Sequence, residues 1–402
     1  MEFFPIRKIG NREKLYSDRP KCRRRTMKIT NITAKSLRNA ERSLSAGPGV
    51  CMVEVETSNG LVGVGEACAQ SEHDEAALAT ALILERGIKP IVVGLDPVNP
   101  RVIWEKLYLE TEWFGRMGTV MHAISALDIA LWDLMGKALG VSVSRLIGGR
   151  FREDVKTYAS IIFDMENFES MADEAKIWTK EGYTAVKFGW GQTRDTAFGL
   201  DAEKDEAAVK YLREALGPEI DIMVDVGRYV NWTPAHALEM ARRFSKYGIY
   251  WLEEPLPQDD VEGFIWLTER SPVKIATGEG EYNRFGFKRL ITTHAADIVQ
   301  PDVGRAGGLT EGMRIADLVQ TWNLELVPHG FSSAINVAAN LQWIASLPRG
   351  ALCEFRRTKS PLMADLIKDP FEAEQGKLKI PDRPGLGIEL REDIVEACLV
   401  KY

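Results

Sequence analysis

Apolar and polar residues follow two different patterns along the chain, and the pattern changes near residue 150. The first part begins with alternating stretches that predict three strands, at residues 27–37, 50–58 and 61–69. The dipeptide Asn59-Gly60 between the last two is a hairpin turn signal. Apolar residues then recur every three or four positions, which predicts helices at about residues 74–87, 99–108 and 119–139. Strands followed by helices indicate a separate α+β domain.

The second part alternates short apolar runs with helical segments eight times. Eight strands are expected, at residues 155–161, 184–190, 221–227, 249–255, 273–279, 297–303, 324–330 and 351–356. Eight such units predict a closed (β/α)8 barrel, an α/β fold. An open doubly wound sheet is the alternative, and it is disfavoured because no glycine-rich phosphate loop follows the first strand.

These patterns divide the chain into four parts. We expect a basic arm at residues 1–26, the α+β domain at 27–150, the barrel at 151–370 and a tail at 371–402 that packs back on the first domain. The arm holds nine Lys and Arg against three Asp and Glu, a net charge of +6, and is typical of a solvated segment rather than a binding tail. The whole chain carries −7, so the remainder carries −13, which favours neither nucleic acid nor an anionic membrane as partner.

Composition narrows the class of protein further. The 402 residues are 45% hydrophobic, enough for a large core. There is no uncharged apolar run of membrane-spanning length and no apolar signal-peptide core near the start. The cysteines are odd in number, scattered and without CxxC spacing: Cys22, Cys51, Cys68, Cys353 and Cys398. This favours a reduced, cytoplasmic protein over a disulfide framework.

Three carboxylates end successive strands of the expected barrel: Asp225, Glu253 and Glu279. Taken singly, each is more often a solvated loop residue or a helix cap. Together at one mouth they repel each other strongly unless a cation lies among them. Oxygen ligation without cysteine or histidine suits a hard cation, Mg²⁺ first and Mn²⁺ second.

Other strand ends carry groups that can move protons or contact a substrate. His329 lies one strand after Asp302, and such a pair fixes the imidazole tautomer that a general acid/base needs, although a helix-capping histidine is the plain alternative. Lys187 and Glu354 end the second and eighth strands. Taken by itself, Lys187 is equally consistent with a snorkelling lysine on the outer surface of the barrel. Four residues just past strand ends are candidate substrate contacts: Arg305, Trp190, Arg284 and Glu254. The remaining histidines are interpreted as structural: His73, His122, His236 and His294.

At this point the residues resemble a known family. The stretches SALDIALWDLMGKALGVSVSRLIGG, WLEEP, TGE, QPDVGRAGG, VPHG and PDRPGLGIEL resemble motifs of the enolase superfamily, in its mandelate racemase-like branch. The resemblance implies a capping domain, built from both chain ends, over the barrel. It also implies Mg²⁺ held by the three carboxylates and abstraction of the proton α to a carboxylate, through an enediolate. In that branch Asp302 and His329 match the acid/base dyad, and Glu354 matches a group that hydrogen-bonds the enediolate.

Two positions depart from the family pattern. Lys187 matches the first lysine of a Lys-x-Lys motif, but Gly189 stands where the second, proton-moving lysine usually lies. Two-base racemisation is therefore disfavoured, and the base is either His329 or Lys187. Gly227 replaces a polar residue common in relatives, which predicts a roomier or wetter side of the substrate site.

These observations favour a dehydratase of an acid sugar, an aldonate or aldarate, that yields a 2-keto-3-deoxy acid. A racemase or epimerase of a 2-hydroxy acid is the enzymatic alternative, and a metal- and ligand-binding barrel without catalysis is the alternative of another class. The partner is a small carboxylate, and the family tends towards homo-oligomers from dimers to octamers. Specificity is expected from residues 38–50 and from the loop near Cys68.

Overall fold

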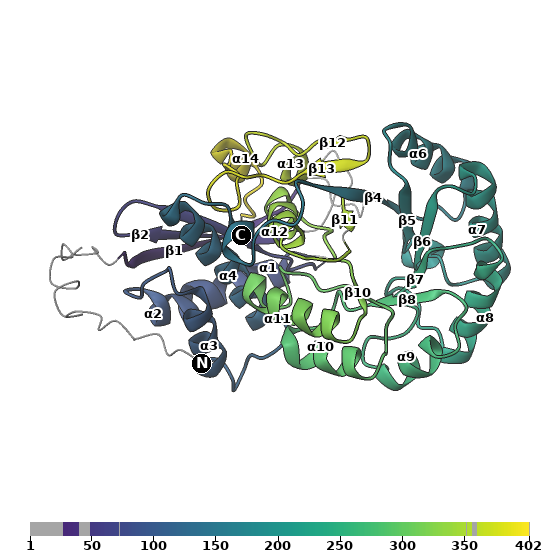
Figure 1. Ribbon diagram of the computed structural model, residues 1–402, viewed down its shortest axis with the longest axis horizontal. Coiled ribbons are helices and arrows are strands. Elements are labelled where there is room, and N and C mark those ends of the chain that lie inside the picture. Colours follow the sequence, from purple (N-terminus) through teal and green to yellow (C-terminus); the bar gives the residue numbers. More distant parts are fainter. Residues whose placement is uncertain (1–26, 40–48, 72, 351, 356–359, 402) are drawn as a thin grey trace, which may run out of the picture.

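A computed structural model describes residues 27–39, 49–71, 73–350, 352–355 and 360–401. The predicted basic arm and most of the predicted specificity loop at 38–50 therefore lie outside the described residues. The molecule has two adjoining parts, an α+β part and a ring of strands surrounded by helices (Figure 1). No helix in the described part of the chain is long and apolar enough to cross a membrane.

The α+β part is an antiparallel sheet packed on helices. Its strands, in the order β1-β2-β3, are β1 (Ile29–Leu37), β2 (Val50–Thr57) and β3 (Val62–Ala67). The helices are α1 (Glu75–Leu82), η3 (Ile83–Ile88), α2 (Lys89–Val92), α3 (Pro100–Glu110), α4 (Thr119–Leu139) and α5 (Val143–Leu146). Helix α4 lies very close to β3, because a Cβ added at Gly65 would approach the carbonyl oxygen of Ala126 to 2.0 Å. Only glycine permits this packing.

The barrel is built from eight parallel strands. They are β4 (Asp154–Ile162), β5 (Ala185–Gly189), β6 (Asp221–Asp225), β7 (Trp251–Glu253), β8 (Lys274–Thr277), β9 (Ile298–Val299), β10 (Glu325–Leu326) and β11 (Leu352–Glu354). The strands pair in sequence order from β4 to β10, and β11 pairs with β4. This order confirms the predicted barrel and excludes the doubly wound sheet.

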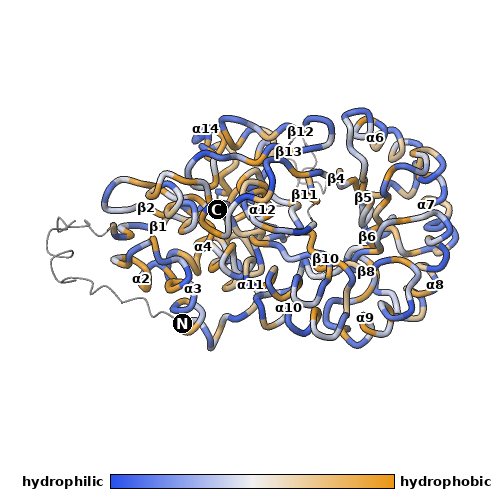
Figure 2. The backbone as a smooth tube through the Cα atoms, viewed as in Figure 1, coloured by the Kyte–Doolittle hydropathy of each residue, from blue (hydrophilic) through white to orange (hydrophobic). Residues whose placement is uncertain are grey.

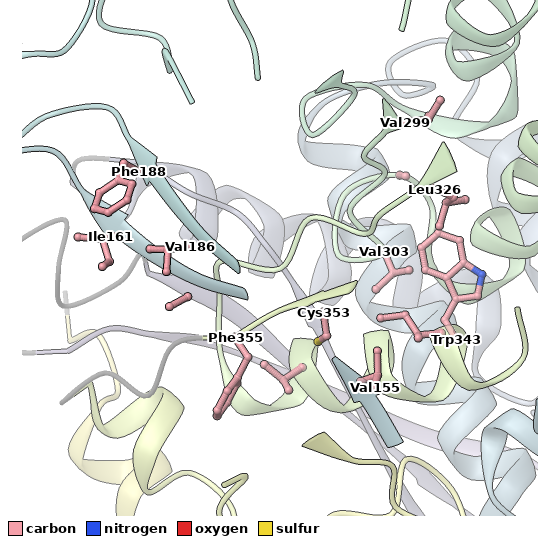
Figure 3. Close-up of a cluster of buried hydrophobic side chains, with 14 of the residues drawn as sticks. Val155, Ile161, Val186, Phe188, Val299, Val303, Leu326, Trp343, Cys353 and Phe355 are labelled. Carbon is pink, nitrogen blue, oxygen red and sulfur yellow. The ribbon is translucent and has the colours of Figure 1, made fainter. Parts of the chain in front are cut away.

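Helices cover the outside of the barrel. The connecting helices are α6 (Phe168–Lys180), η4 (Arg194–Thr196), α7 (Ala202–Leu216), α8 (Pro234–Ser245), α9 (Val261–Thr268), α10 (Asn283–Thr292), α11 (Gly308–Thr321), α12 (Ala334–Ala345) and α13 (Pro361–Ala364). Hydrophilic residues lie mainly along their outer edge (Figure 2). On β5, the side chains of Val186 and Phe188 belong to the buried cluster between strands and helices (Figure 3). Because side chains alternate along a strand, Lys187 points into the barrel.

The barrel interior below the strand ends is closed by packed side chains. One residue at each of the eight strand positions joins this cluster: Tyr158, Ala185, Met223, Trp251, Ala276, Ile298, Val327 and Leu352. Such a layer makes the barrel a packed core rather than a channel. Any ligand bound at the strand ends must therefore approach from the side of the α+β part.

The C-terminal segment contacts both parts of the molecule. The hairpin β12 (Ala373–Glu374) and β13 (Lys377–Lys379) pairs antiparallel with the first half of β4, while the second half of β4 pairs with β5. Further on, after α14 (Glu392–Ala397), Leu399 bridges Leu37 at the end of β1. The α+β part and this returning segment together form the cap that the fold class predicted.

Candidate active site

The three predicted carboxylates meet at the barrel mouth. Asp225, Glu253 and Glu279 are buried, and each offers an oxygen within 4.8 Å of the others. One oxygen of each carboxylate is held by the protein. The Gly227 N–H donates to Asp225 (2.9 Å), the Trp251 indole to Glu253 (2.8 Å) and Arg228 to Glu279 (3.2 Å). The other oxygens lie beside basic side chains, with Lys187 next to Glu253 and Asp225 and with His329 next to Glu279. The three carboxylates together form a group that could hold a metal ion.

Positive side chains occupy the space around these oxygens. Lys187 Nζ lies 2.7 Å from Glu253, 3.5 Å from Asp225 and 3.3 Å from Glu354. Burial by itself would lower the pKa of Lys187, but these carboxylates hold it well above its ordinary value. The snorkelling interpretation of Lys187 is therefore wrong, because its ammonium is buried among three carboxylates.

His329 and Asp302 form a buried pair beside the carboxylates. His329 Nδ1 lies 2.8 Å from Asp302 Oδ2, and His329 Nε2 lies 3.2 Å from Glu279 Oε2. Burial would lower the pKa of His329, yet Glu279 and Asp302 raise it to about 9. Burial would raise the pKa of Glu279, yet His329 and Arg228 lower it to about 2. Glu354 also lies next to the His329 loop, where it accepts a hydrogen bond from the Gly330 N–H at 3.1 Å and faces Lys187.

Several residues that hold this site in place were not foreseen from the sequence. Asn336 on α12 donates to Asp302 at 3.2 Å. Glu66 on β3 accepts from the hydroxyls of Ser332 and Ser333 at the start of α12. The strand VGVGEA does carry an acidic residue next to its last position, but nothing local shows that this side chain reaches the barrel. Arg228, three residues past Asp225, had a clearer signal, because a cation that close to a buried carboxylate commonly pairs with its neighbours.

Two of the predicted substrate contacts lie next to the site. Arg305 is buried, and its guanidinium donates to the carbonyls of Cys68 and Glu279, both at 3.2 Å, so it joins the cap to the metal-ligand strand. Glu254 accepts from Thr277 at 2.6 Å, and burial with the nearby charge of Glu279 raises its pKa to about 6. The loop near Cys68, which we expected to set substrate specificity, is thus connected to the mouth by its hydrogen bond with Arg305.

The expectation of open space at Gly227 is wrong. A Cβ at this residue, whose φ is +71°, would lie 2.7 Å from the Trp190 indole. The indole fills the space that the missing side chain leaves, and its edge meets the Tyr229 ring at 5.2 Å. Gly189 is similarly confined, because an added Cβ would lie 3.0 Å from the Asp225 carboxylate. Gly227 and Gly189 are the two departures from the family pattern. Because they lack a Cβ, the side chains of Trp190 and Asp225 can lie close to the backbone at these positions.

Arg284 is not placed as a substrate contact. Its guanidinium pairs with Glu311 on α11 and lies 3.5 Å from Glu105 on α3. It also lies over the Trp104 ring, at 5.2 Å from the ring centroid. These partners place the guanidinium in the contact between cap and barrel.

Comparisons with known proteins agree with this architecture. A family model described as "Enolase C-terminal domain-like" matches residues 170–394, and one described as "Mandelate racemase / muconate lactonizing enzyme, N-terminal domain" matches residues 29–148. The chain belongs to the enolase superfamily, in its mandelate racemase-like branch, as the sequence motifs predicted.

Individual relatives cover most of the chain. D-galactarolactone cycloisomerase of Agrobacterium fabrum is 33% identical over 85% of this chain and 89% of its own. Arabinonate dehydratase of Saccharolobus solfataricus is 33% identical over 86% of this chain and 90% of its own. The crystal structure of 3,6-anhydro-D-galactonate cycloisomerase from Zobellia galactanivorans has a TM-score of 0.83 and 31% identity, and covers 93% of this chain and 100% of its own.

Proposed function

We propose that the protein is a Mg²⁺-dependent dehydratase of an acid sugar. Asp225, Glu253 and Glu279 would hold the cation, with Mn²⁺ as a substitute. The observation that supports this most is that the three buried carboxylates bring an oxygen each to within 4.8 Å of one another. When bound, a divalent cation supplies a positive charge against which the charge of an enediolate is stabilised.

The side chains around this point suit removal of an α-proton. His329 Nε2 faces the metal-ligand side, while Asp302 holds the other ring nitrogen and fixes the tautomer. Glu279 is the largest influence that raises the pKa of His329, so neutralising that carboxylate brings the imidazole towards the range in which a base works. Lys187, with its raised pKa, remains a cation suited to a substrate carboxylate.

Dehydration then needs only one face of the substrate. His329 takes the α-proton, the electron pair forms the enediolate, and the β-hydroxyl leaves with a proton returned by the same imidazolium. Water and an enol result, and the enol tautomerises to a 2-keto-3-deoxy acid. Gly189 carries no group for the opposite face, which supports elimination over the racemase alternative. Relatives named as arabinonate, D-xylonate and D-gluconate dehydratases support the same reaction type.

A cycloisomerase is the second candidate. Both a curated relative at 33% identity and a solved structure at 31% identity carry that name. The first step would be unchanged, with His329 removing an α-proton. If the oxygen that leaves the β-carbon is part of a ring, it stays in the molecule, and an isomer forms instead of water.

The test is a screen of four- to six-carbon aldonates, aldarates and their lactones, with Mg²⁺ and in deuterated water. A dehydratase gives a 2-keto-3-deoxy acid, and a cycloisomerase gives a product of unchanged mass apart from deuterium. Deuterium at the α-carbon without a keto group would contradict both and indicate a racemase. No turnover, together with ligand affinity unchanged in His329→Asn, would indicate the non-catalytic binding barrel. For a dehydratase, His329→Asn lowers kcat by about 10²- to 10⁴-fold.

A further inference from the structure

Trp251 lies below the carboxylate of Glu253 inside the barrel. Both residues belong to β7 and are two positions apart, so their side chains point to the same face of the strand. Trp251 is fully buried in the packed layer that closes the barrel interior. Its ring meets the Tyr158 ring edge-on, with 5.6 Å between the centroids, and lies 5.4 Å from the Tyr250 ring. These contacts fix the direction in which the indole N–H points.

The two oxygens of Glu253 have different partners. The Trp251 indole donates to Oε2 at 2.8 Å, and the Lys187 ammonium donates to Oε1 at 2.7 Å. Lys187 also lies 3.3 Å from Glu354 and 3.5 Å from Asp225, so it keeps other partners if a cation binds at Oε1. The indole is a donor only, and breaking its bond to Oε2 would leave a buried N–H unpaired. Oε2 is therefore fixed on the indole, whereas Oε1 can exchange one cation for another.

Asp225 shows the same division between its two oxygens. The Gly227 N–H donates to Oδ1 at 2.9 Å, and Lys187 lies 3.5 Å from Oδ2. Both fixed donors are neutral and cannot move far, because one belongs to the main chain and the other to the packed layer. Each of these two carboxylates thus has one oxygen engaged by a fixed donor.

A carboxylate limited to one oxygen affects the choice of cation. Ca²⁺ takes about six to eight oxygens and accepts carboxylates that bind through both oxygens, whereas Mg²⁺ demands a near-ideal octahedron. The two oxygens of one carboxylate are too close together to fit two corners of that octahedron. We propose that Trp251 is a positioning residue that limits Glu253 to one-oxygen ligation, and so shifts the preference of the three carboxylates from Ca²⁺ towards Mg²⁺. This inference rests on the proposed function, because it assumes that these carboxylates hold a divalent cation.

The test measures cation affinity directly and does not depend on turnover. Mn²⁺ is the probe, because the electron paramagnetic resonance signal of free Mn²⁺ reports how much is bound. Mg²⁺ or Ca²⁺ then displaces it from the full-length protein, which has first been treated with EDTA and dialysed. Trp251→Phe keeps a buried aromatic ring and removes the N–H. We expect the affinity for Mg²⁺ to fall by about tenfold, as it does when an outer partner of a ligand is lost, and that for Ca²⁺ to fall by less than about twofold or to rise.

Trp343→Phe is the matched control. Trp343 is also fully buried, in the cluster between strands and helices (Figure 3), and its indole N–H has no hydrogen-bond partner in the described part of the chain. This substitution removes the same atoms from the core without removing a donor to a carboxylate. Both cations should therefore bind within about twofold of the wild type. If Trp251→Phe does not fold, replacement of Trp251 by 3-benzothienylalanine keeps the shape of the indole, puts sulfur in place of the N–H, and should lower the preference for Mg²⁺ in the same way.

Equal weakening of Mg²⁺ and Ca²⁺ in Trp251→Phe, or no change in either, would overturn the inference in favour of a packing role and leave the proposed function standing. A wild type that binds no divalent cation would overturn the inference together with the proposed metal site. Selective loss of Mg²⁺ affinity in a protein that turns over no acid sugar would uphold the role of Trp251 and contradict the proposed reaction.

Discussion

Buried carboxylates occur in two regions of the molecule, and they are solvated by the protein in opposite ways. In the seam between cap and barrel, Asp128 accepts from the backbone N–H and the hydroxyl of Thr310, and Glu66 accepts from two serine hydroxyls. Both oxygens of each seam carboxylate are used. At the mouth, Asp225, Glu253 and Glu279 lie instead beside basic side chains, with Lys187 next to Asp225 and Glu253 and with Arg228 and His329 next to Glu279.

The difference shows in their protonation. Burial raises the pKa of Asp128 and of Glu66 to about 7, because neutral donors compensate only part of the lost hydration. At the mouth, His329 and Arg228 overcome burial and lower the pKa of Glu279 to about 2, whereas burial and the charge of Glu253 raise the pKa of Asp225. Burial alone therefore does not mark a functional carboxylate. Charged neighbours do.

The largest expected effect comes from removing charge at the mouth. Asp225→Asn should lower kcat/KM for an acid sugar by about 10³-fold, since a ligand to the cation is lost. It should not lower the melting temperature of the metal-free protein, because like-charge repulsion is relieved. Steady-state kinetics and thermal unfolding in EDTA measure the two effects. Asp205→Asn, a buried carboxylate at the start of α7 that accepts from Gly199, is the control and should keep kcat/KM within about threefold. Equal losses in both variants would remove the distinction between the two kinds of carboxylate.

A seam carboxylate should instead govern how stability depends on pH. The pKa of Glu66 is raised from 4.5 to about 7, so the folded state binds more protons than the unfolded state between these values. The stability contribution is full below pH 4.5 and is lost as pH rises to 7, by up to about 3 kcal/mol. Glu66→Gln should abolish this part of the pH dependence of the free energy of unfolding. Urea unfolding of both proteins at pH 5 and pH 8 measures it. If the free energy of unfolding depends on pH in the same way in the wild type and in Glu66→Gln, Glu66 is charged in the folded protein.

A residue between the two regions should have a smaller effect. Asn336 donates to Asp302, but the Gly304 N–H also holds that carboxylate, at 2.7 Å. Asn336→Leu should therefore lower kcat only about tenfold, or roughly 1.4 kcal/mol, and leave KM unchanged. Initial-rate measurements separate the two constants. A change in KM alone would place Asn336 in binding rather than in orienting the dyad.

The smallest effect is expected at Arg284. Because its partners are Glu311, Glu105 and the Trp104 ring, Arg284→Gln should cost about 1 kcal/mol of stability and change kcat/KM by less than about twofold. Urea unfolding and steady-state kinetics check both. A tenfold rise in KM would instead indicate that Arg284 contacts the substrate.

The sequence predicted the barrel well, because each strand carries its own signal. Alternation placed Lys187 towards the interior and Val186 away from it, and the strand ends placed Asp225 and Glu253 at one mouth. These are local rules that hold wherever the strand sits. They depend only on parallel strands ending at the same edge.

What the sequence did not predict depends on pairs of distant residues. Arg284 lies in the contact between cap and barrel because Glu311, on another helix, pairs with it. The space at Gly227 is filled by Trp190, 37 positions earlier, and neither residue predicts the other. Ser125 on α4 meets the loop after Asp302 only because this helix docks against the barrel. Such contacts follow from how elements pack, which local periodicity does not encode.

The bridge between Leu37 and Leu399 has a consequence for how the protein is made. The β1 strand is an edge of its sheet, paired on one side with β2, and backbone hydrogen bonds from Arg38 to Cys398 and from Val400 to Ser36 cover its end. During translation, β1 emerges more than 350 residues before these partners. This edge of β1 therefore stays uncovered until residues 398–400 have left the ribosome, and an uncovered strand edge can pair with other chains. The cap is completed only after the whole barrel has been synthesised, however early its three strands form.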